Sequence, residues 1–207
     1  MGLSLISSGR IYRWLRLLHL YGGLLVSPFL VVFAVSAILL NHPSLQSSPA
    51  EPARRQASID VPGGLKGLNL AKEVMRQTGV TGEIDFFSEQ AQGPRISVPV
   101  SRPSVKITIT ADLTAKTANI STRPATFGER AIYLHKYPGP HVANIRGNWV
   151  FTRLWGVLAD GTVYLLLFVT VTGIYIWYIV KSERKRGLAF LGAGCVVFAV
   201  VLLALIR

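Results

Sequence analysis

Cysteine is nearly absent from this sequence: Cys195 is the only one in 207 residues. A single cysteine excludes an intramolecular disulfide bond and a zinc site made of several thiolates. Cys195 lies in the apolar run G-C-V-V-F-A-V, which favours a small hydrophobic packing residue over a reactive thiol. The sequence also lacks a phosphate-binding loop, a dinucleotide fingerprint and a nucleophile with a neighbouring base, so nothing points to those enzyme classes.

Acidic residues are scarce as well, with 10 Asp and Glu against 22 Lys and Arg and a formal net charge of +12. Such an excess is common in nucleic-acid-binding proteins. Here the basic residues are spread along the chain and lie next to apolar runs, a distribution that is typical of membrane topology. Because 50% of the residues are also hydrophobic, we expect a lipid bilayer around the chain and no nucleic-acid partner.

Three long apolar runs stand out, at about residues 17–40, 158–180 and 188–206. Each is close to the ~20 residues with which a helix crosses the ~30 Å hydrocarbon core of a bilayer. Helices are expected because lipid cannot satisfy the open hydrogen bonds of an extended or irregular segment. The sequence therefore predicts three transmembrane helices.

The charges beside these runs predict their orientation. Basic residues precede the first run and fill the link between the second and third: Arg10, Arg13, Arg16, Lys181, Arg184, Lys185 and Arg186. The positive-inside rule puts both groups in the cytoplasm, whereas residues 43–156 form a loop long enough to cross regardless of charge. V-S-A at 35–37 resembles a signal-peptidase site, but the run is longer than that of a signal peptide, so an uncleaved helix is expected.

Between the first and second runs, the pattern predicts a small α+β domain. Five apolar residues recur at helical spacing before the T-G pair at 78–79: Leu68, Leu70, Ala71, Val74 and Met75. Extended runs follow near 83–87, 95–100, 105–110 and 116–120, and then a helix at about 127–137. The third run alternates like a half-buried antiparallel strand, and Pro99 in the second favours a sheet edge. The predicted fold class is an α+β membrane protein.

These patterns divide the chain into five parts. They are a cytoplasmic N-terminus with the first helix (1–42), a linker (43–67), an extracytoplasmic domain (68–147), the second helix with its outer lead-in (148–180), and a cytoplasmic link with the third helix (181–207). The linker is assigned from its Pro- and Ser-rich start, N-H-P-S-L-Q-S-S-P-A-E-P, which also ends the first helix.

Several motifs resemble those of PepSY-associated transmembrane (PepSY-TM) proteins. The first span reads R-x-L-H-L-Y-G-G-L and ends A-I-L-L-N-H, a meander turn reads I-T-I-T-A-D-L-T, a helix ends L-H-K, and a later span ends T-V-T-G-I-Y-I-W-Y. The resemblance covers nearly the whole chain, as a short form. It implies a PepSY-like domain held outside the bacterial inner membrane. Larger members resemble ferric-siderophore reductases, some with b-type haem between their helices, so haem b, iron and electron transfer are expectations that follow from the resemblance.

The candidate ligands are the four histidines, His19, His42, His135 and His141, because neutral imidazoles bind haem iron, zinc and copper. His19 and His42 are ~35 Å apart on one helix, so they do not share an iron. An outer site is conceivable from His42 with His135 or His141, while His19 needs a second ligand from another copy or subunit. We expect His19, His42 and His135 as haem ligands. The alternative is a metal site of His42, His135 and His141.

Each histidine also has a purely structural interpretation. His19 fits an interfacial side chain that reaches toward headgroups, and His42 fits the end of a helix before Pro43. His135 fits a satisfied helix-end residue, and His141 an exposed residue after the P-G-P turn.

Two functions remain open on the sequence alone. The first is a b-haem protein that passes electrons to ferric iron or to a redox partner, as a homodimer or with another membrane subunit. The second is a non-enzymatic accessory or structural subunit that docks on a larger inner-membrane complex through its periplasmic domain. Metal sensing or chaperoning by the outer histidines is a third. Whether the protein is an enzyme stays open.

Overall fold

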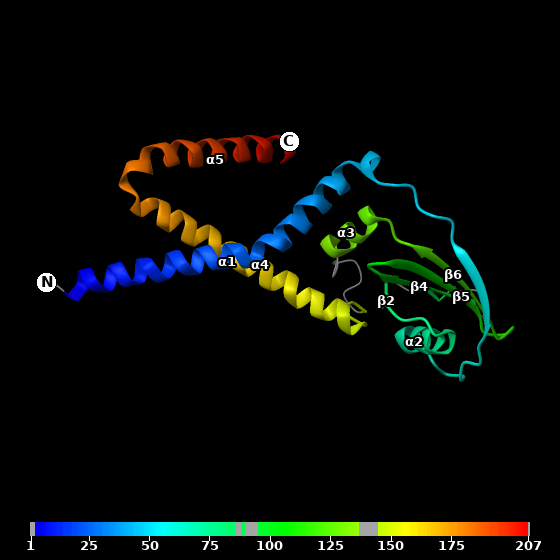
Figure 1. Ribbon diagram of the computed structural model, residues 1–207. Helices are drawn as coiled ribbons and strands as arrows, with labels where there is room; N and C mark the ends of the chain where they lie inside the picture. Colours follow the sequence, from blue (N-terminus) through cyan, green and yellow to red (C-terminus); the bar gives the residue numbers. More distant parts are fainter. Residues whose placement is uncertain (1–2, 86–87, 90–94, 137–144, 207) are drawn as a thin grey trace. The chain divides into compact units, whose positions relative to one another are not determined.

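The computed structural model describes residues 3–85, 88–89, 95–136 and 145–206. The chain forms two compact units, one of Met1–Pro28 with Gly161–Arg207 and the other of Phe29–Asp160. Three helices are long and apolar enough to cross a membrane: α1 (Leu3–Asn41), α4 (Val150–Ile179) and α5 (Arg184–Ile206) (Figure 1). The three predicted apolar helices are thus confirmed, and their length and composition indicate a multi-pass membrane protein.

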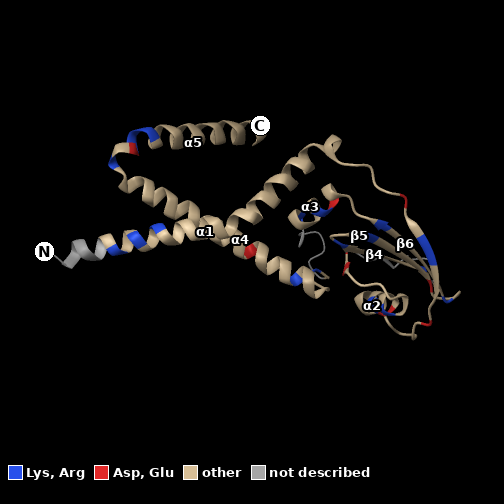
Figure 2. Ribbon diagram, in the orientation of Figure 1, with Lys and Arg blue, Asp and Glu red and all other residues tan. Residues whose placement is uncertain are grey.

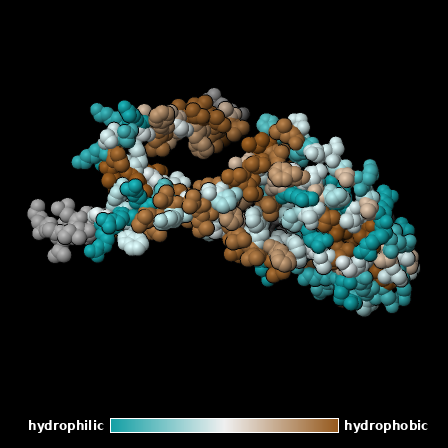
Figure 3. All heavy atoms as spheres, in the orientation of Figure 1, coloured by the Kyte–Doolittle hydropathy of each residue, from teal (hydrophilic) through white to brown (hydrophobic). Residues whose placement is uncertain are grey.

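The first unit contains α1 as far as Pro28, α4 from Gly161 onward, and α5. The short 3₁₀ turn η3 (Lys181–Glu183) joins α4 to α5. Lys and Arg gather on α1 at residues 10–16 and on the link between α4 and α5 (Figure 2). Every residue from Leu188 to Ile206 is exposed, so α5 presents hydrophobic side chains on all sides within this unit. Figure 3 shows hydrophobic atoms along the face of α5 that is in view. A helix that is hydrophobic all round needs lipid or another protein around it.

Small residues let α1 and α4 approach each other within the first unit. A Cβ atom added at Gly22 would lie 3.3 Å from Leu165 Cδ1 and 3.5 Å from Val169 Cγ2. The less exposed positions of this part of α1 recur every three or four residues: Tyr12, Leu15, His19, Gly22 and Val26. That spacing is the seam of a coiled-coil-like pair, in which glycine allows close backbone approach in lipid.

The second unit is built on a six-stranded antiparallel sheet in the order β1-β6-β5-β4-β2, with β3 also paired to β4. The strands are β1 (Ala53–Ser58), β2 (Glu83–Ile84), β3 (Ser88–Glu89), β4 (Arg95–Arg102), β5 (Val105–Asp112) and β6 (Thr117–Pro124). The predicted helices are present as α2 (Gly67–Thr78) and α3 (Phe127–Lys136), and the turn η1 (Pro43–Leu45) follows α1. The α+β class is therefore confirmed.

Alternation along the strands separates an apolar face from a polar one. On β5, Ile107, Ile109 and Ala111 are buried, whereas the intervening Lys106, Thr108 and Thr110 are exposed. The buried residues form one core with the apolar side of α2, which contributes Leu70, Ala71, Val74 and Met75. Gly79 ends α2 in the left-handed region at φ 67°, a conformation that glycine adopts without a Cβ penalty. On the opposite face, Lys106 and Arg123 point toward α3.

Two features of the sheet differ from the sequence-based expectation. Strand β1 lies inside the range 43–67, which was expected to be a linker, and it pairs with β6 from Ala53↔Thr122 to Ser58↔Thr117. It was missed because its A-R-R-Q-A-S sequence lies at an exposed edge and has no apolar alternation.

The edge position expected for Pro99 is wrong, because β4 pairs with β5 on one side and with β2 and β3 on the other. Pro99 lies between the part of β4 that pairs with β2 and the part that pairs with β3. Its carbonyl points to that side of the strand and accepts from Asp85 N–H at 3.0 Å. The N–H that proline lacks would point to the same side, outside both paired segments.

A buried carboxylate connects the sheet to the start of α4. Glu83, which is 2% exposed, accepts hydrogen bonds from the backbone N–H groups of Gly147, Asn148 and Trp149 at 2.7, 3.2 and 2.7 Å. The Asn148 side chain completes the connection by donating to the carbonyls of Ile84 and Ile145 and accepting from Ile84 N–H. These donors precede α4, where helical N–H groups lack partners and a negative charge is stabilising.

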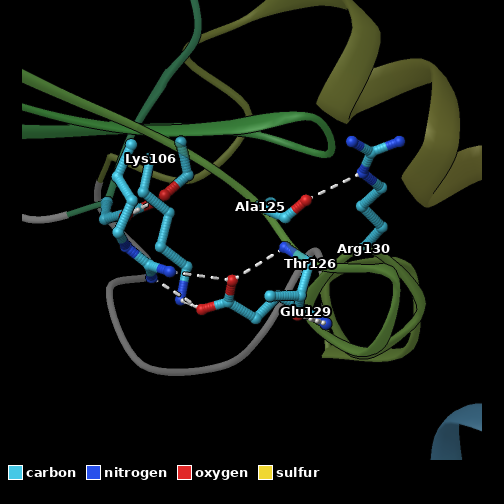
Figure 4. A network of polar contacts seen from close by, with 8 residues as sticks. Lys106, Ala125, Thr126, Glu129 and Arg130 are labelled. Carbon is cyan, nitrogen blue, oxygen red and sulfur yellow. Dashed lines mark hydrogen bonds and ion pairs between the residues drawn. The ribbon is translucent and has the colours of Figure 1, made fainter. Parts of the chain in front are cut away.

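A second carboxylate holds the start of α3 against the sheet (Figure 4). Glu129 Oε2 accepts from Thr126 N–H at 3.0 Å while Thr126 Oγ1 accepts from Glu129 N–H at 3.2 Å, the reciprocal pattern of a capping box. Glu129 also pairs with Arg123 at 2.6 Å and Lys106 at 2.9 Å. The Arg123 hydrogen bond is the main cause that lowers the pKa of Glu129 to about 2.

We expect Glu83→Ala to lower the free energy of unfolding by ~3 kcal/mol, because three half-buried backbone donors lose a buried, charged acceptor. Hydrogen exchange should accelerate at Gly147, Asn148 and Trp149 in the detergent-solubilised chain. Glu51→Gln, at an exposed residue without a described ion pair, is the control. Unchanged exchange at those three amides would contradict the role assigned to Glu83.

The Glu129 pairs predict a loss of stability in acid. Because the folded pKa of about 2 lies below the ordinary value of 4.5, the stabilisation is complete above pH 4.5 and is lost as the pH falls through 2. Glu129→Gln keeps an acceptor for Thr126 N–H but removes the charge, so its denaturation midpoint should change less over this interval than that of the natural chain or of Glu51→Gln. Equal slopes for all three proteins would refute the assignment.

Candidate functional site

His19 lies in the first unit, where α1 faces α4. Its Nδ1 atom is 3.0 Å from Thr172 Oγ1, and the threonine is 5% exposed. The single hydroxyl proton of Thr172 is donated to the Phe168 carbonyl at 2.8 Å. Thr172 Oγ1 can then only accept from the imidazole, so the network assigns the proton of neutral His19 to Nδ1 and leaves Nε2 with a free lone pair.

Gly173 makes room for this imidazole. A Cβ atom at Gly173 would lie 3.1 Å from His19 Cε1, 3.8 Å from Nδ1 and 4.0 Å from Nε2. The ring therefore rests on the backbone of α4, and the T-G pair at 172–173 supplies both its hydrogen-bond acceptor and the space that it fills.

His135, an exposed residue on α3 in the second unit, makes the same kind of hydroxyl contact. Its Nδ1 atom is 2.8 Å from the hydroxyl of Ser36 on α1, which is 0% exposed and donates its own proton to the Phe33 carbonyl at 2.8 Å. By the same argument, Nδ1 of neutral His135 carries the proton and Nε2 is the acceptor. The Phe33 ring packs edge-on against the imidazole at 5.7 Å.

Further contacts fix the end of α3 on the helices around it. Trp155 Nε1 of α4 donates to the Leu134 carbonyl at 2.9 Å, and its indole lies 6.3 Å from Phe29 and 6.4 Å from Phe33. The Tyr133 hydroxyl is 3.5 Å from Thr152 Oγ1, and burial raises the pKa of this tyrosine. These contacts connect the residues just before His135 to α4.

The other two candidate histidines are not brought into such an arrangement. His42 is exposed at the N-cap of η1, and its imidazole makes no hydrogen bond within the described part of the chain. His141 lies outside the described residues, as does the P-G-P turn. Among residues 3–85, 88–89, 95–136 and 145–206, no three His, Cys, Asp or Glu side chains form a group that could hold a metal ion. The three-histidine metal site stays a prediction.

Sequence reasoning identified the two oriented histidines but missed what orients them. Thr172 and Gly173 were noted only within the motif T-V-T-G-I-Y-I-W-Y, and Ser36 only within V-S-A. The available signal was spacing, since Phe29, Phe33 and Ser36 continue the three- and four-residue rhythm that faces a partner helix. A hydroxyl at such a position in an apolar helix marks a place where another polar side chain can be bound.

The arrangement is chemically suited to ligation. A histidine that binds a metal usually donates its other ring N–H to a fixed acceptor, which sets the tautomer and makes the ligating nitrogen more basic. His19 and His135 each have such an acceptor. His19 belongs to the first compact unit and His135 to the second, and each is described within its own unit.

Comparison of the chain with protein-family models, with curated proteins and with solved structures found no match in any of the three.

The hydroxyl contacts predict the tautomers of two histidines. Nitrogen-15 NMR of the histidine-labelled chain should find His19 and His135 with the proton on Nδ1, whereas free imidazole side chains favour Nε2. Thr172→Val should reverse or mix the tautomer of His19 alone, and Ser36→Ala that of His135 alone, each at a cost of ~1 kcal/mol in stability. Proton signals on Nε2 of both residues in the natural chain would contradict the assignment.

Proposed function

We propose that the protein is an inner-membrane electron-transfer component of PepSY-TM type, in which His19 and His135 each supply one axial ligand to a b-type haem. One observation carries the proposal: Nδ1 of each histidine lies within hydrogen-bond distance of a buried hydroxyl, and that hydroxyl also bonds a carbonyl of its own helix. With the hydroxyl proton on the carbonyl, Nδ1 is the donor and Nε2 is left as an acceptor. Bound haem would supply the one-electron chemistry, and the chain's own residues orient the two ligands.

The second ligand at each half-site then comes from another polypeptide. A second copy of the chain is the simplest source, because a twofold axis brings the same histidine from both copies to one iron. The fully exposed α5 and the exposed apolar faces of α1 and α4 offer helix surface for such an association. We propose a homodimer for this reason.

The orientation inferred from the basic flanks would put the α+β domain in the periplasm and His135 at the outer side of the membrane. An outer half-site beside this domain suits delivery of electrons to ferric iron or to a periplasmic redox partner. The domain itself, with its hydrogen-bonded sheet and capped α3, would act as the docking module.

A different class of function is favoured by another observation. Within the described residues no complete metal or haem site is formed, and every residue of α5 beyond Gly187 is exposed. These features also suit a non-enzymatic accessory subunit whose helices complete a larger membrane complex. His19 and His135 would then serve only to connect helices to one another and to α3.

The visible spectrum of the chain distinguishes these proposals. We expect protein purified in mild detergent from haem-supplied cells to show a Soret band that shifts on dithionite reduction, with sharp α and β bands. His19→Ala and His135→Ala should each remove about half of the bound haem, since each eliminates one of two sites. His42→Ala, at a histidine whose imidazole makes no hydrogen bond within the described residues, is the matched control and should keep the full spectrum.

A flat spectrum from a folded homodimer would refute the electron-transfer proposal. Recovery of the chain in a larger assembly that is lost in the His135→Ala variant, again without haem, would support the accessory subunit instead.

A further inference from the structure

The link between α4 and α5 carries a dense group of basic side chains that the proposed function does not use. We call residues 181–186 the basic turn, which contains Lys181, Arg184, Lys185 and Arg186 and one acidic residue, Glu183. It joins two helices that are each apolar enough to cross a membrane. Figure 2 shows Lys and Arg on this turn and on α1 at residues 10–16, which belong to the same unit.

Arg184 is fixed in this turn by two contacts with Tyr178. Its guanidinium carbon lies 4.4 Å from the centroid of the tyrosine ring, and its Nε–H donates to the Tyr178 carbonyl at 2.6 Å. Neither contact uses the two terminal amino groups, which make no further hydrogen bond within the described part of the chain. The planar fork is therefore held ready to donate two parallel hydrogen bonds to an anion.

The backbone of the turn is held as firmly as this side chain. Trp177 Nε1 donates to the Glu183 carbonyl at 3.2 Å. The indole also occupies the space beside Gly187, where an added Cβ atom would meet the ring well inside van der Waals contact. The aromatic pair Trp177 and Tyr178 thus organises the basic turn at the end of a membrane helix, the depth at which such side chains meet headgroups.

Among the described residues, the charge of the turn is only weakly neutralised. Glu183 lies 3.7 Å from Arg186, and both side chains are largely exposed, so this pair is weak. Lys181 and Lys185 are exposed and have no described ion pair. A partner of negative charge at the level of lipid headgroups would satisfy the oriented fork and the neighbouring lysines together.

We propose that the basic turn binds the phosphate of an anionic phospholipid, with Arg184 as the oriented ligand and Lys185 as the second charge. The chemistry is recognition of a phosphodiester beside an apolar surface. Each basic side chain near an anionic membrane surface strengthens binding about fivefold. The inference is independent of haem, because it uses none of the histidines.

Native mass spectrometry of the full chain in detergent tests the proposal. Titrated with phosphatidylglycerol or phosphatidylcholine, the chain should retain the anionic lipid preferentially. Arg184→Gln with Lys185→Gln should weaken phosphatidylglycerol binding about 25-fold and leave phosphatidylcholine binding unchanged. Lys66→Gln with Lys72→Gln removes two exposed charges from the α+β domain and should change neither.

Other results would overturn the proposal. These are equal retention of the two lipids, equal losses in the test and control variants, or complete displacement of phosphatidylglycerol by an equal concentration of inorganic phosphate, which would indicate a free-phosphate site. If the double variant fails to fold, Lys185→Gln alone decides, since this exposed side chain makes no described contact and its loss should cost about fivefold.

Discussion

The carboxylate of Glu83 accepts three consecutive backbone N–H groups just before α4, and the arrangement of the second unit depends on this contact. A buried charge is costly unless every oxygen is hydrogen-bonded, and a helix start has unpaired donors to offer. The backbone donors stabilise the buried charge of Glu83, and Glu83 provides the acceptor that these donors would otherwise lack. Because β2 lies within the sheet and α4 continues as an apolar helix, this bond makes the α+β domain and the start of a membrane helix one cooperative structure.

Buried polar groups in the helices are hydrogen-bonded as well. Ser36 and Thr172 are buried hydroxyls in apolar segments, and each returns its proton to a carbonyl of its own helix. The oxygen that remains can only accept, so any imidazole that reaches it is forced into one tautomer. A hydroxyl that bonds a carbonyl of its own apolar helix thus orients a neighbouring histidine and leaves the Nε2 atom of that histidine as an acceptor. That orientation is a prerequisite of ligation and is also sufficient to hold helices together, which is why electron transfer and a structural role compete.

The two units use their charged side chains differently. Acidic side chains in the α+β domain are used internally, as Glu83 and Glu129 are, to bind helix starts and basic neighbours. On the helical unit the basic side chains of the α4–α5 link face outward on an aromatic support. The carboxylates bind groups within their own domain, whereas the basic side chains between two apolar helices are available to bind anionic lipid headgroups.

Periodicity in the sequence determined the three apolar helices, α2, α3 and the alternating strands β4 to β6, because burial by lipid or by a sheet follows from local spacing alone. It also identified His19 and His135 as candidates from residue type. Local spacing does not encode partners distant in sequence, so β1, the interior position of Pro99 and the role of Glu83 needed the assembled sheet. The hydroxyls lie 153 residues from His19 and 99 from His135, and only the tertiary structure brought these atoms within hydrogen-bond distance.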